Sequence, residues 1–98
     1  MPEKLSEEEI EQRMQDVAEW SVVGDGIQRT YHFRDFVQSI AFVRRVADAA
    51  EVAQHHPDIL IRYNKVTLSL STHDAGGITD KDFALARKVD SFAPEASA

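Results

Sequence analysis

The stretch that organises this chain is residues 58–73, DILIRYNKVTLSLSTH, because its apolar side chains alternate along two runs. One run ends at Tyr63, the other begins at Val66, and the polar pair Asn64-Lys65 stands between them. Alternation of period two on both sides of a short polar connection is typical of a β-hairpin. We therefore expect a hairpin over about residues 58–73 with Asn64-Lys65 as its two-residue loop, so that Tyr63 pairs with Val66.

The expected register also brings two histidines together. It pairs Ile59 with Leu70 on the apolar face of the hairpin and His56 with His73 on the opposite face. The Cβ atoms of directly opposed residues in an antiparallel pair lie about 4.5–5.5 Å apart. We therefore expect the imidazoles of His56 and His73 to meet.

Three helices and a second hairpin are predicted around this stretch. A capping box formed by Ser6 and Glu9 predicts a helix over about residues 6–18. Asp35 is a good N-cap for a long helix, which must end near Pro57. The remaining expected elements are a hairpin over about residues 20–34 and a helix over about residues 80–92 that follows Thr79.

The order α-β-β-α-β-β-α indicates an α+β fold. We expect a two-layer domain in which helices pack on one face of a four-stranded, mostly antiparallel sheet. The 98 residues leave room for one domain, 1–98, with its core over about residues 5–92 and a frayed tail at 93–98.

The long middle helix carries two apolar stripes, which predicts that it is broadly buried. The first stripe is Phe36, Ile40, Val43 and Ala47, and the second is Phe42, Val46, Ala49 and Ala53. One further turn takes the first stripe to Glu51, so we expect this carboxylate on the inward face near the end of the helix.

Composition excludes several classes of function. A net charge of -6 and a pI near 5.1 argue against direct binding of nucleic acid, whose partners usually present basic patches. The sequence has no cysteine, and therefore no disulfide or thiolate site, which is consistent with a reducing compartment. The N-terminus lacks an apolar signal core and no stretch is long enough to span a membrane, so we expect a cytoplasmic protein without membrane contact.

One set of residues indicates chemistry. Its members are Glu51, His55-His56-Pro57, Tyr63, His73 and Asp82. Histidine is the side chain that gains or loses charge near neutral pH without special help. Imidazoles gathered around one pocket supply both proton donors and proton acceptors. The set therefore predicts an acid/base site on a small domain.

The spacing of this set resembles that of the pterin-4a-carbinolamine dehydratase family. The resemblance covers about residues 5–92 and includes Trp20, Phe33-Arg34-Asp35-Phe36, Tyr63-Asn64-Lys65-Val66 and Leu70-Ser71-Thr72-His73. One departure is visible, because many members of the family carry Trp two residues after the proline, where this chain has Ile59.

The resemblance implies a reaction in which 4a-hydroxytetrahydropterin, formed by aromatic amino acid hydroxylases, loses water to give quinonoid dihydropterin. It implies that His55 and His73 are the acid/base pair and that His56 binds and orients the pterin. The residues expected to contact the substrate or to fix imidazole tautomers are Glu51, Pro57, Asp82 and Trp20. No metal or organic cofactor is expected, because no electrons are transferred overall. A homodimer or a dimer of dimers is expected.

Two other functions fit part of the pattern. Three histidines and a carboxylate could hold zinc, although adjacent histidines seldom both reach one ion. Some relatives of the family act as transcription-factor dimerisation cofactors or Rubisco assembly factors, and such roles would not need the histidines. Single residues also have structural explanations: Trp20 fits the core, His32 an exposed strand, Asp82 a cap with Thr79, and Glu51 an ion pair with Arg44 or Arg45.

Overall fold

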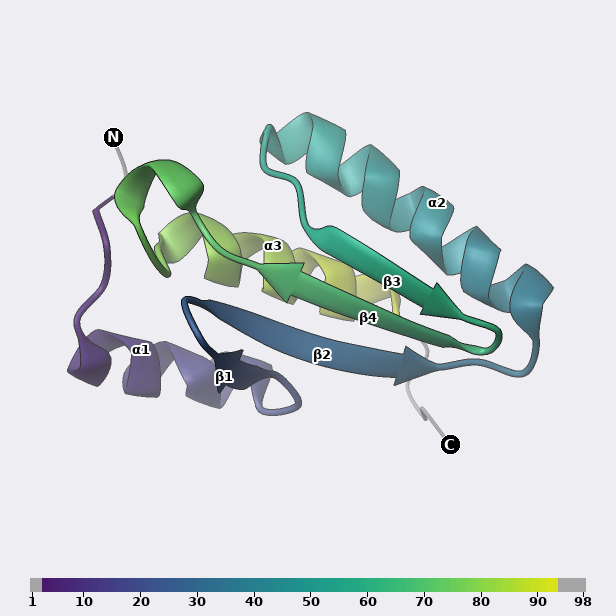
Figure 1. Ribbon diagram of the computed structural model, residues 1–98, viewed down its shortest axis with the longest axis horizontal. Helices are drawn as coiled ribbons and strands as arrows, with labels where there is room; N and C mark the ends of the chain where they lie inside the picture. Colours follow the sequence, from purple (N-terminus) through teal and green to yellow (C-terminus); the bar gives the residue numbers. More distant parts are fainter. Residues whose placement is uncertain (1–2, 94–98) are drawn as a thin grey trace.

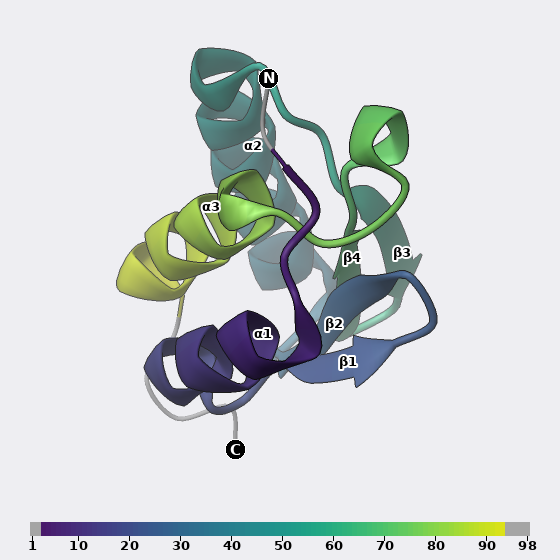
Figure 2. The same cartoon turned by 90° about the vertical axis from the view of Figure 1, so that its left-hand side faces the viewer.

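The computed structural model describes residues 3–93, which form three α-helices packed on one face of a four-stranded antiparallel sheet (Figures 1 and 2). The α-helices are α1 (Glu7–Met14), α2 (Phe36–Ala53) and α3 (Asp80–Phe92), and the short 3-10 helices are η1 (Gln15–Val17) and η2 (His73–Ala75). The strands are β1 (Ser21–Val23), β2 (Gly26–His32), β3 (Asp58–Arg62) and β4 (Lys65–Leu70), in the sheet order β1-β2-β4-β3. The predicted α+β fold and its order of elements are confirmed.

The α-helices begin at the predicted N-caps. Ser6 and Glu9 form a capping box at α1, and the hydrogen bonds from Ser6 hold the pKa of Glu9 below its usual value. The side chain of Asp35 caps α2, and Thr79 and Asp82 form a second capping box at α3. Each cap satisfies backbone N–H groups that have no partner within the helix. The first predicted helix is therefore correct in its start, although its last turn is η1.

The core lies between the helices and the inner face of the sheet. Its largest fully buried apolar side chains are Val17 of η1, Tyr31 and Ile27 of β2, Val66, Leu68 and Leu70 of β4, Val46 of α2, and Phe83 and Val89 of α3. Burying each such aliphatic or aromatic side chain contributes about 1.5–3 kcal/mol. The central strands β2 and β4 thus fix the layer on which the helices pack.

The loop of the second hairpin differs from the prediction. Tyr63 and Asn64 form the loop, because Arg62 pairs with Lys65, and Tyr63 adopts a left-handed φ of 52°. The expected register is therefore wrong by two residues: Ile59 pairs with Leu68. A shift of two keeps every side chain on its predicted face, so the apolar pattern could not reveal the error.

The predicted pairing of His56 with His73 is wrong for the same reason. β3 begins at Asp58, which pairs with Ser69, and β4 ends at Leu70. His56 therefore precedes the paired residues, whereas His73 follows them as the first residue of η2. Both histidines leave the sheet at the same end of the hairpin, but they are not opposed across it.

Helix α2 is less buried than its two apolar stripes predict. Its buried residues are Ser39, Phe42, Val46 and Ala50. Phe36 and Ile40 of the first stripe are 49% and 40% exposed, and Glu51 is exposed as well, so its expected inward orientation is wrong. The physical reason is that α2 contacts α3 and β4 along one side only.

Within residues 3–93, no helix is long and apolar enough to cross a membrane. The predicted frayed tail, 93–98, lies outside the described residues except for Ala93.

Candidate active site

The C-terminal end of α2, η2 and the start of α3 lie at the same end of the molecule (Figure 1). Helix α2 ends at Gln54, which adopts a left-handed φ of 53°, so the chain leaves the helix axis before His55 and His56. The backbone N–H of His55 then donates to the carbonyl of Ala50 at 3.2 Å. This C-terminal cap holds His55 against the body of the domain and directs His56 away from it.

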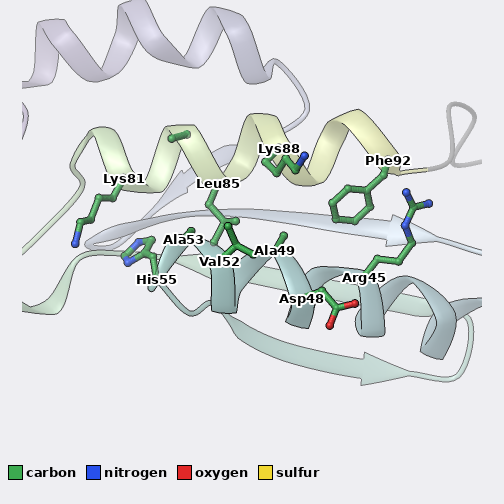
Figure 3. A pocket seen from close by; sticks show the side chains of 11 residues that line it. Arg45, Asp48, Ala49, Val52, Ala53, His55, Lys81, Leu85, Lys88 and Phe92 are labelled. Carbon is green, nitrogen blue, oxygen red and sulfur yellow. The ribbon is translucent and has the colours of Figure 1, made fainter.

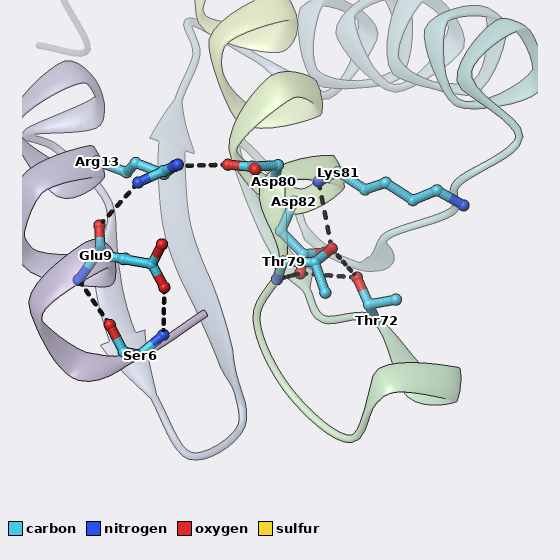
Figure 4. A network of polar contacts seen from close by, with 8 residues as sticks. All are labelled: Ser6, Glu9, Arg13, Thr72, Thr79, Asp80, Lys81 and Asp82. Carbon is cyan, nitrogen blue, oxygen red and sulfur yellow. Dashed lines mark hydrogen bonds and ion pairs between the residues drawn. The ribbon is translucent and has the colours of Figure 1, made fainter. Parts of the chain in front are cut away.

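His55 is paired with a buried carboxylate. Its Nε2 lies 2.5 Å from Oδ1 of Asp82, whose side chain is 0% exposed, while the side chain of His55 is 11% exposed. A buried carboxylate is tolerated only where hydrogen bonds replace its water. Asp82 meets this condition, because Thr72 Oγ1 and the backbone N–H of Thr79 both donate to its Oδ2, at 3.0 and 2.9 Å (Figure 4).

Asp82 therefore makes two contacts at once. It completes the capping box at the start of α3, and it also binds His55 across 27 positions of sequence. An ionised Asp82 can only accept hydrogen bonds, so Nε2 of His55 carries the hydrogen in this pair. In the neutral ring, Nδ1 of His55 is then left free to accept a proton.

His56 has a different partner. Its Nε2 lies 2.6 Å from Oε2 of Glu51, and the two side chains are 58% and 73% exposed. Glu51 thus bonds a histidine rather than Arg44 or Arg45. This exposed pair lies on the last turn of α2 and immediately after it, next to the half-buried Pro57.

His73 reaches the same end of the molecule through its neighbour in sequence. It is exposed at the start of η2, whereas Thr72 is buried and bonds Asp82 directly. The backbone N–H of Thr72 donates to the carbonyl of Gly77 at 2.9 Å, which closes the loop that carries His73. The structure therefore ties His73 to the His55–Asp82 pair through one intervening residue.

Two residues of the predicted set lie elsewhere. Trp20 is 3% exposed and its Nε1–H donates to both carboxylate oxygens of Asp90, at 3.1 and 3.2 Å. Trp20 therefore lies in the core, where its one polar side-chain atom is already hydrogen-bonded. Tyr63 lies in the hairpin loop, at the opposite end of β3 from Pro57.

A groove of about 580 Å³ runs between α2 and α3 and reaches the candidate site at His55, the one residue of the predicted set that lines it (Figure 3). His55 and Lys81 line one end, and Arg45 and Phe92 line the other. The guanidinium of Arg45 lies 4.7 Å from the centre of the Phe92 ring, a cation–π contact that closes the far end. Alanine, valine and leucine side chains of the two helices form most of the remaining wall.

Sequence reasoning missed Thr72 and Lys81. Thr72 stands directly before His73, and nothing in the alternation shows that it faces a buried carboxylate. Lys81 precedes Asp82, and its position in the groove depends on how α2 and α3 pack. Among residues 3–93, no group of three or more His, Asp and Glu side chains is arranged to hold a metal ion, so the zinc alternative finds no ligand set there.

A protein-family model and two similar relatives point to the same family. The family model described as pterin 4 alpha carbinolamine dehydratase matches residues 3–92. A chain of Thermomicrobium roseum is 51% identical over 90 residues, which cover 92% of this chain and 97% of the relative. A chain of Roseiflexus castenholzii is 55% identical over 86 residues, which cover 88% and 92%. Both relatives are named provisionally as pterin-4-alpha-carbinolamine dehydratases.

Solved structures share the fold. A transcriptional coactivator/pterin dehydratase from Brucella melitensis superposes with a TM-score of 0.89 at 32% identity, covering 93% of this chain and 99% of that one. A pterin dehydratase-like protein described as a RuBisCO assembly factor in the alpha-carboxysome gives a TM-score of 0.66 at 24% identity, covering 79% and 92%. The second likeness concerns the fold alone.

Proposed function

This chain belongs to the pterin-4α-carbinolamine dehydratase family, and we propose that it removes water from 4a-hydroxytetrahydropterins by histidine acid/base catalysis. The product would be a quinonoid dihydropterin. The observation that carries this proposal is the buried His55–Asp82 pair, which holds an imidazole at the end of a groove with Nδ1 free to accept a proton.

The reaction needs one base and one acid. Hydroxide is a poor leaving group, so the oxygen on C4a must receive a proton as the C4a–O bond breaks. The N5–H bond breaks at the same time, and its electron pair forms the C4a–N5 double bond while the oxygen leaves as water. A positioned base and acid contribute about 10²- to 10⁴-fold to such a reaction.

We assign the base to His55 and the acid to His73, with exchange of these functions between substrate stereoisomers. His55 is oriented by Asp82, and orientation by a buried carboxylate selects one tautomer of an imidazole. His73 is exposed on η2, at the same end of the molecule as His55. His56, bonded by Glu51, would bind and orient the pterin ring.

Stopped-flow kinetics with freshly generated 4a-hydroxytetrahydropterin tests this proposal. We expect the native chain to accelerate dehydration, and we expect His55→Ala combined with His73→Ala to reduce the rate by about 10²-fold or more. His32→Ala is the matched control, because His32 pairs with Lys65 at the opposite end of the sheet and should leave the rate unchanged. A native chain without activity, or a double variant with the native rate, would contradict the proposal.

A binding or assembly function is the second candidate, because α2 carries exposed apolar side chains. Phe36 and Ile40 are 49% and 40% exposed, and Val37 is 73% exposed. An apolar helix face of this kind is typical of a protein–protein contact. We propose that this face forms the contact between copies of the chain in a homodimer or homotetramer. We also propose that an aromatic amino acid hydroxylase supplies the substrate of the dehydration. Sedimentation of the native chain and of Val37→Glu would test the contact, and a native monomer would contradict it.

A further inference from the structure

A chain of hydrogen bonds runs from Thr79 through Thr72 to Asp82 (Figure 4), the carboxylate that bonds His55. Thr72 Oγ1 lies 2.7 Å from Thr79 Oγ1 and 3.0 Å from Asp82 Oδ2. The three side chains are buried, at 6% exposure for Thr72 and 0% for Thr79 and Asp82. Water therefore has little access to them, and their hydrogen bonds must be satisfied within the protein.

The directions of these hydrogen bonds follow from counting hydrogens. Thr72 has one hydroxyl hydrogen, and the carboxylate of Asp82 can only accept, so Thr72 donates to Asp82. The hydroxyl of Thr79 must then donate to Thr72. Thr79 Oγ1 in turn accepts the backbone N–H of Lys81 at 3.2 Å. Each hydrogen bond in this chain therefore has a defined donor, and each donor points along the chain toward Asp82.

This direction fixes the carboxylate. Oδ2 of Asp82 accepts from the hydroxyl of Thr72 and from the backbone N–H of Thr79, so the remaining oxygen, Oδ1, is presented to His55. Hydrogen bonds to a charged acceptor are about twice as strong as neutral ones, which makes this arrangement stiff. The backbone of Thr72 also holds the loop before His73.

We propose that Thr72 is a positioning residue, which holds Asp82 in the rotamer that keeps His55 as its Nε2–H tautomer. The kinetic part of this inference rests on the proposed dehydratase function, whereas the tautomer does not. Thr72 hydrogen-bonds Asp82, which in turn bonds His55, so it acts through Asp82.

The tautomer is measured directly by long-range ¹H–¹⁵N correlation of the histidine rings in ¹⁵N-labelled protein. In the native chain we expect Nε2 of His55 to carry the hydrogen at a pH where the ring is neutral. Thr72→Val keeps the size and β-branching of the side chain but removes the donor, and we expect a mixture of tautomers at His55. Thr72→Ser restores the hydroxyl and should restore the native pattern.

Thr67→Val is the matched control. Thr67 lies on β4, the strand that leads to Thr72, and its hydroxyl lies 2.7 Å from that of Thr30. This hydrogen bond joins two hydroxyl groups and involves no carboxylate. The control variant should therefore leave the His55 ring signals and kcat unchanged. In the stopped-flow assay, Thr72→Val should lower kcat by about 10- to 100-fold with KM changed less than about threefold, and Thr72→Ser should retain most of kcat.

The outcomes separate the two proposals. A native His55 with its hydrogen on Nδ1 overturns the inference without any variant, so the test does not depend on the folding of Thr72→Val. A folded Thr72→Val with the native tautomer and native kcat overturns it as well. A native chain that lacks dehydratase activity, but whose single His55 tautomer is lost in Thr72→Val, supports the positioning by Thr72 and contradicts only the proposed function.

Discussion

Helix α3 carries two carboxylates, the buried Asp82 and the half-buried Asp90, and the two are bonded by different kinds of donor. Asp82 is bonded by Thr72, the backbone of Thr79 and His55. Asp90 is bonded by three side chains, one that directly precedes β1 and two on β2. These are Trp20 Nε1 at 3.1 Å, Arg29 Nη1 at 2.9 Å and the Tyr31 hydroxyl at 2.5 Å. Each carboxylate thus gathers donors that are distant in sequence.

The two clusters differ in whether a donor can release its proton. Indole and guanidinium groups keep their protons at neutral pH. Burial, followed by the hydrogen bond to Asp90, raises the pKa of Tyr31 well above its usual value, so this donor keeps its proton too. Imidazole is the one type of donor group in the two clusters that can act as an acid or a base in catalysis near neutral pH. The Asp90 cluster therefore stabilises the fold, and the Asp82 cluster is suited to proton transfer.

The largest expected effect on stability comes from Asp90→Asn. This substitution leaves the charge of Arg29 without its partner, 12% exposed, and weakens the bonds from Trp20 and Tyr31. We expect the free energy of unfolding to fall by about 2–4 kcal/mol, measured by urea unfolding at pH 7. A loss below about 0.5 kcal/mol would show that the Asp90 cluster contributes little to the fold.

A smaller effect is expected for Tyr31→Phe, and it depends on pH. The substitution removes one hydrogen bond to a charged group, which costs about 1.5–3 kcal/mol. The pKa of Tyr31 is raised in the folded chain, so the unfolded chain loses this proton first, near its ordinary value of about 10. The contribution of Tyr31 is therefore complete below about pH 10 and is lost as the pH rises above it.

Urea unfolding of the native chain and of Tyr31→Phe between pH 8 and pH 11 measures this difference. The native chain should lose stability more steeply than the variant at the alkaline end of the range. Parallel curves over the whole range would contradict the account of this cluster.

The smallest effect is expected for Glu51→Gln, which removes a carboxylate–imidazole pair that is exposed. Because the side chains of His56 and Glu51 are 58% and 73% exposed, the pair should contribute less than about 0.5 kcal/mol to unfolding. The same urea experiment checks this value. A loss as large as that of Asp90→Asn would mean that exposure does not separate the two kinds of pair.

Local patterns predicted the elements of this fold well. The capping residues Ser6, Asp35 and Thr79 mark the helix starts, and alternation marks the strands, because both signals depend on near neighbours in sequence. The hairpin register was not predicted, since Tyr63 rather than Lys65 occupies the loop and a shift of two leaves the apolar face unchanged.

Contacts between distant segments were predicted less well. The periodicity of α2 shows which residues share a stripe, but it does not show which stripe meets the sheet, so Glu51 was placed inward. His55 and Asp82 both belong to the predicted set, but their contact depends on the packing of α2 beside α3. Trp20 was grouped with the site by resemblance, whereas its partner Asp90 is visible only in the folded chain.

The central claim is that the Asp82 cluster performs chemistry and the Asp90 cluster does not. The most direct measurement is the rate of 4a-hydroxytetrahydropterin dehydration by Asp82→Asn and by Asp90→Asn, in one stopped-flow experiment and at a temperature where both variants are folded. We predict that Asp82→Asn is slower than the native chain by about 10²- to 10⁴-fold, because His55 loses its orienting carboxylate, while Asp90→Asn stays within about twofold. Equal rates for the two variants would contradict the claim.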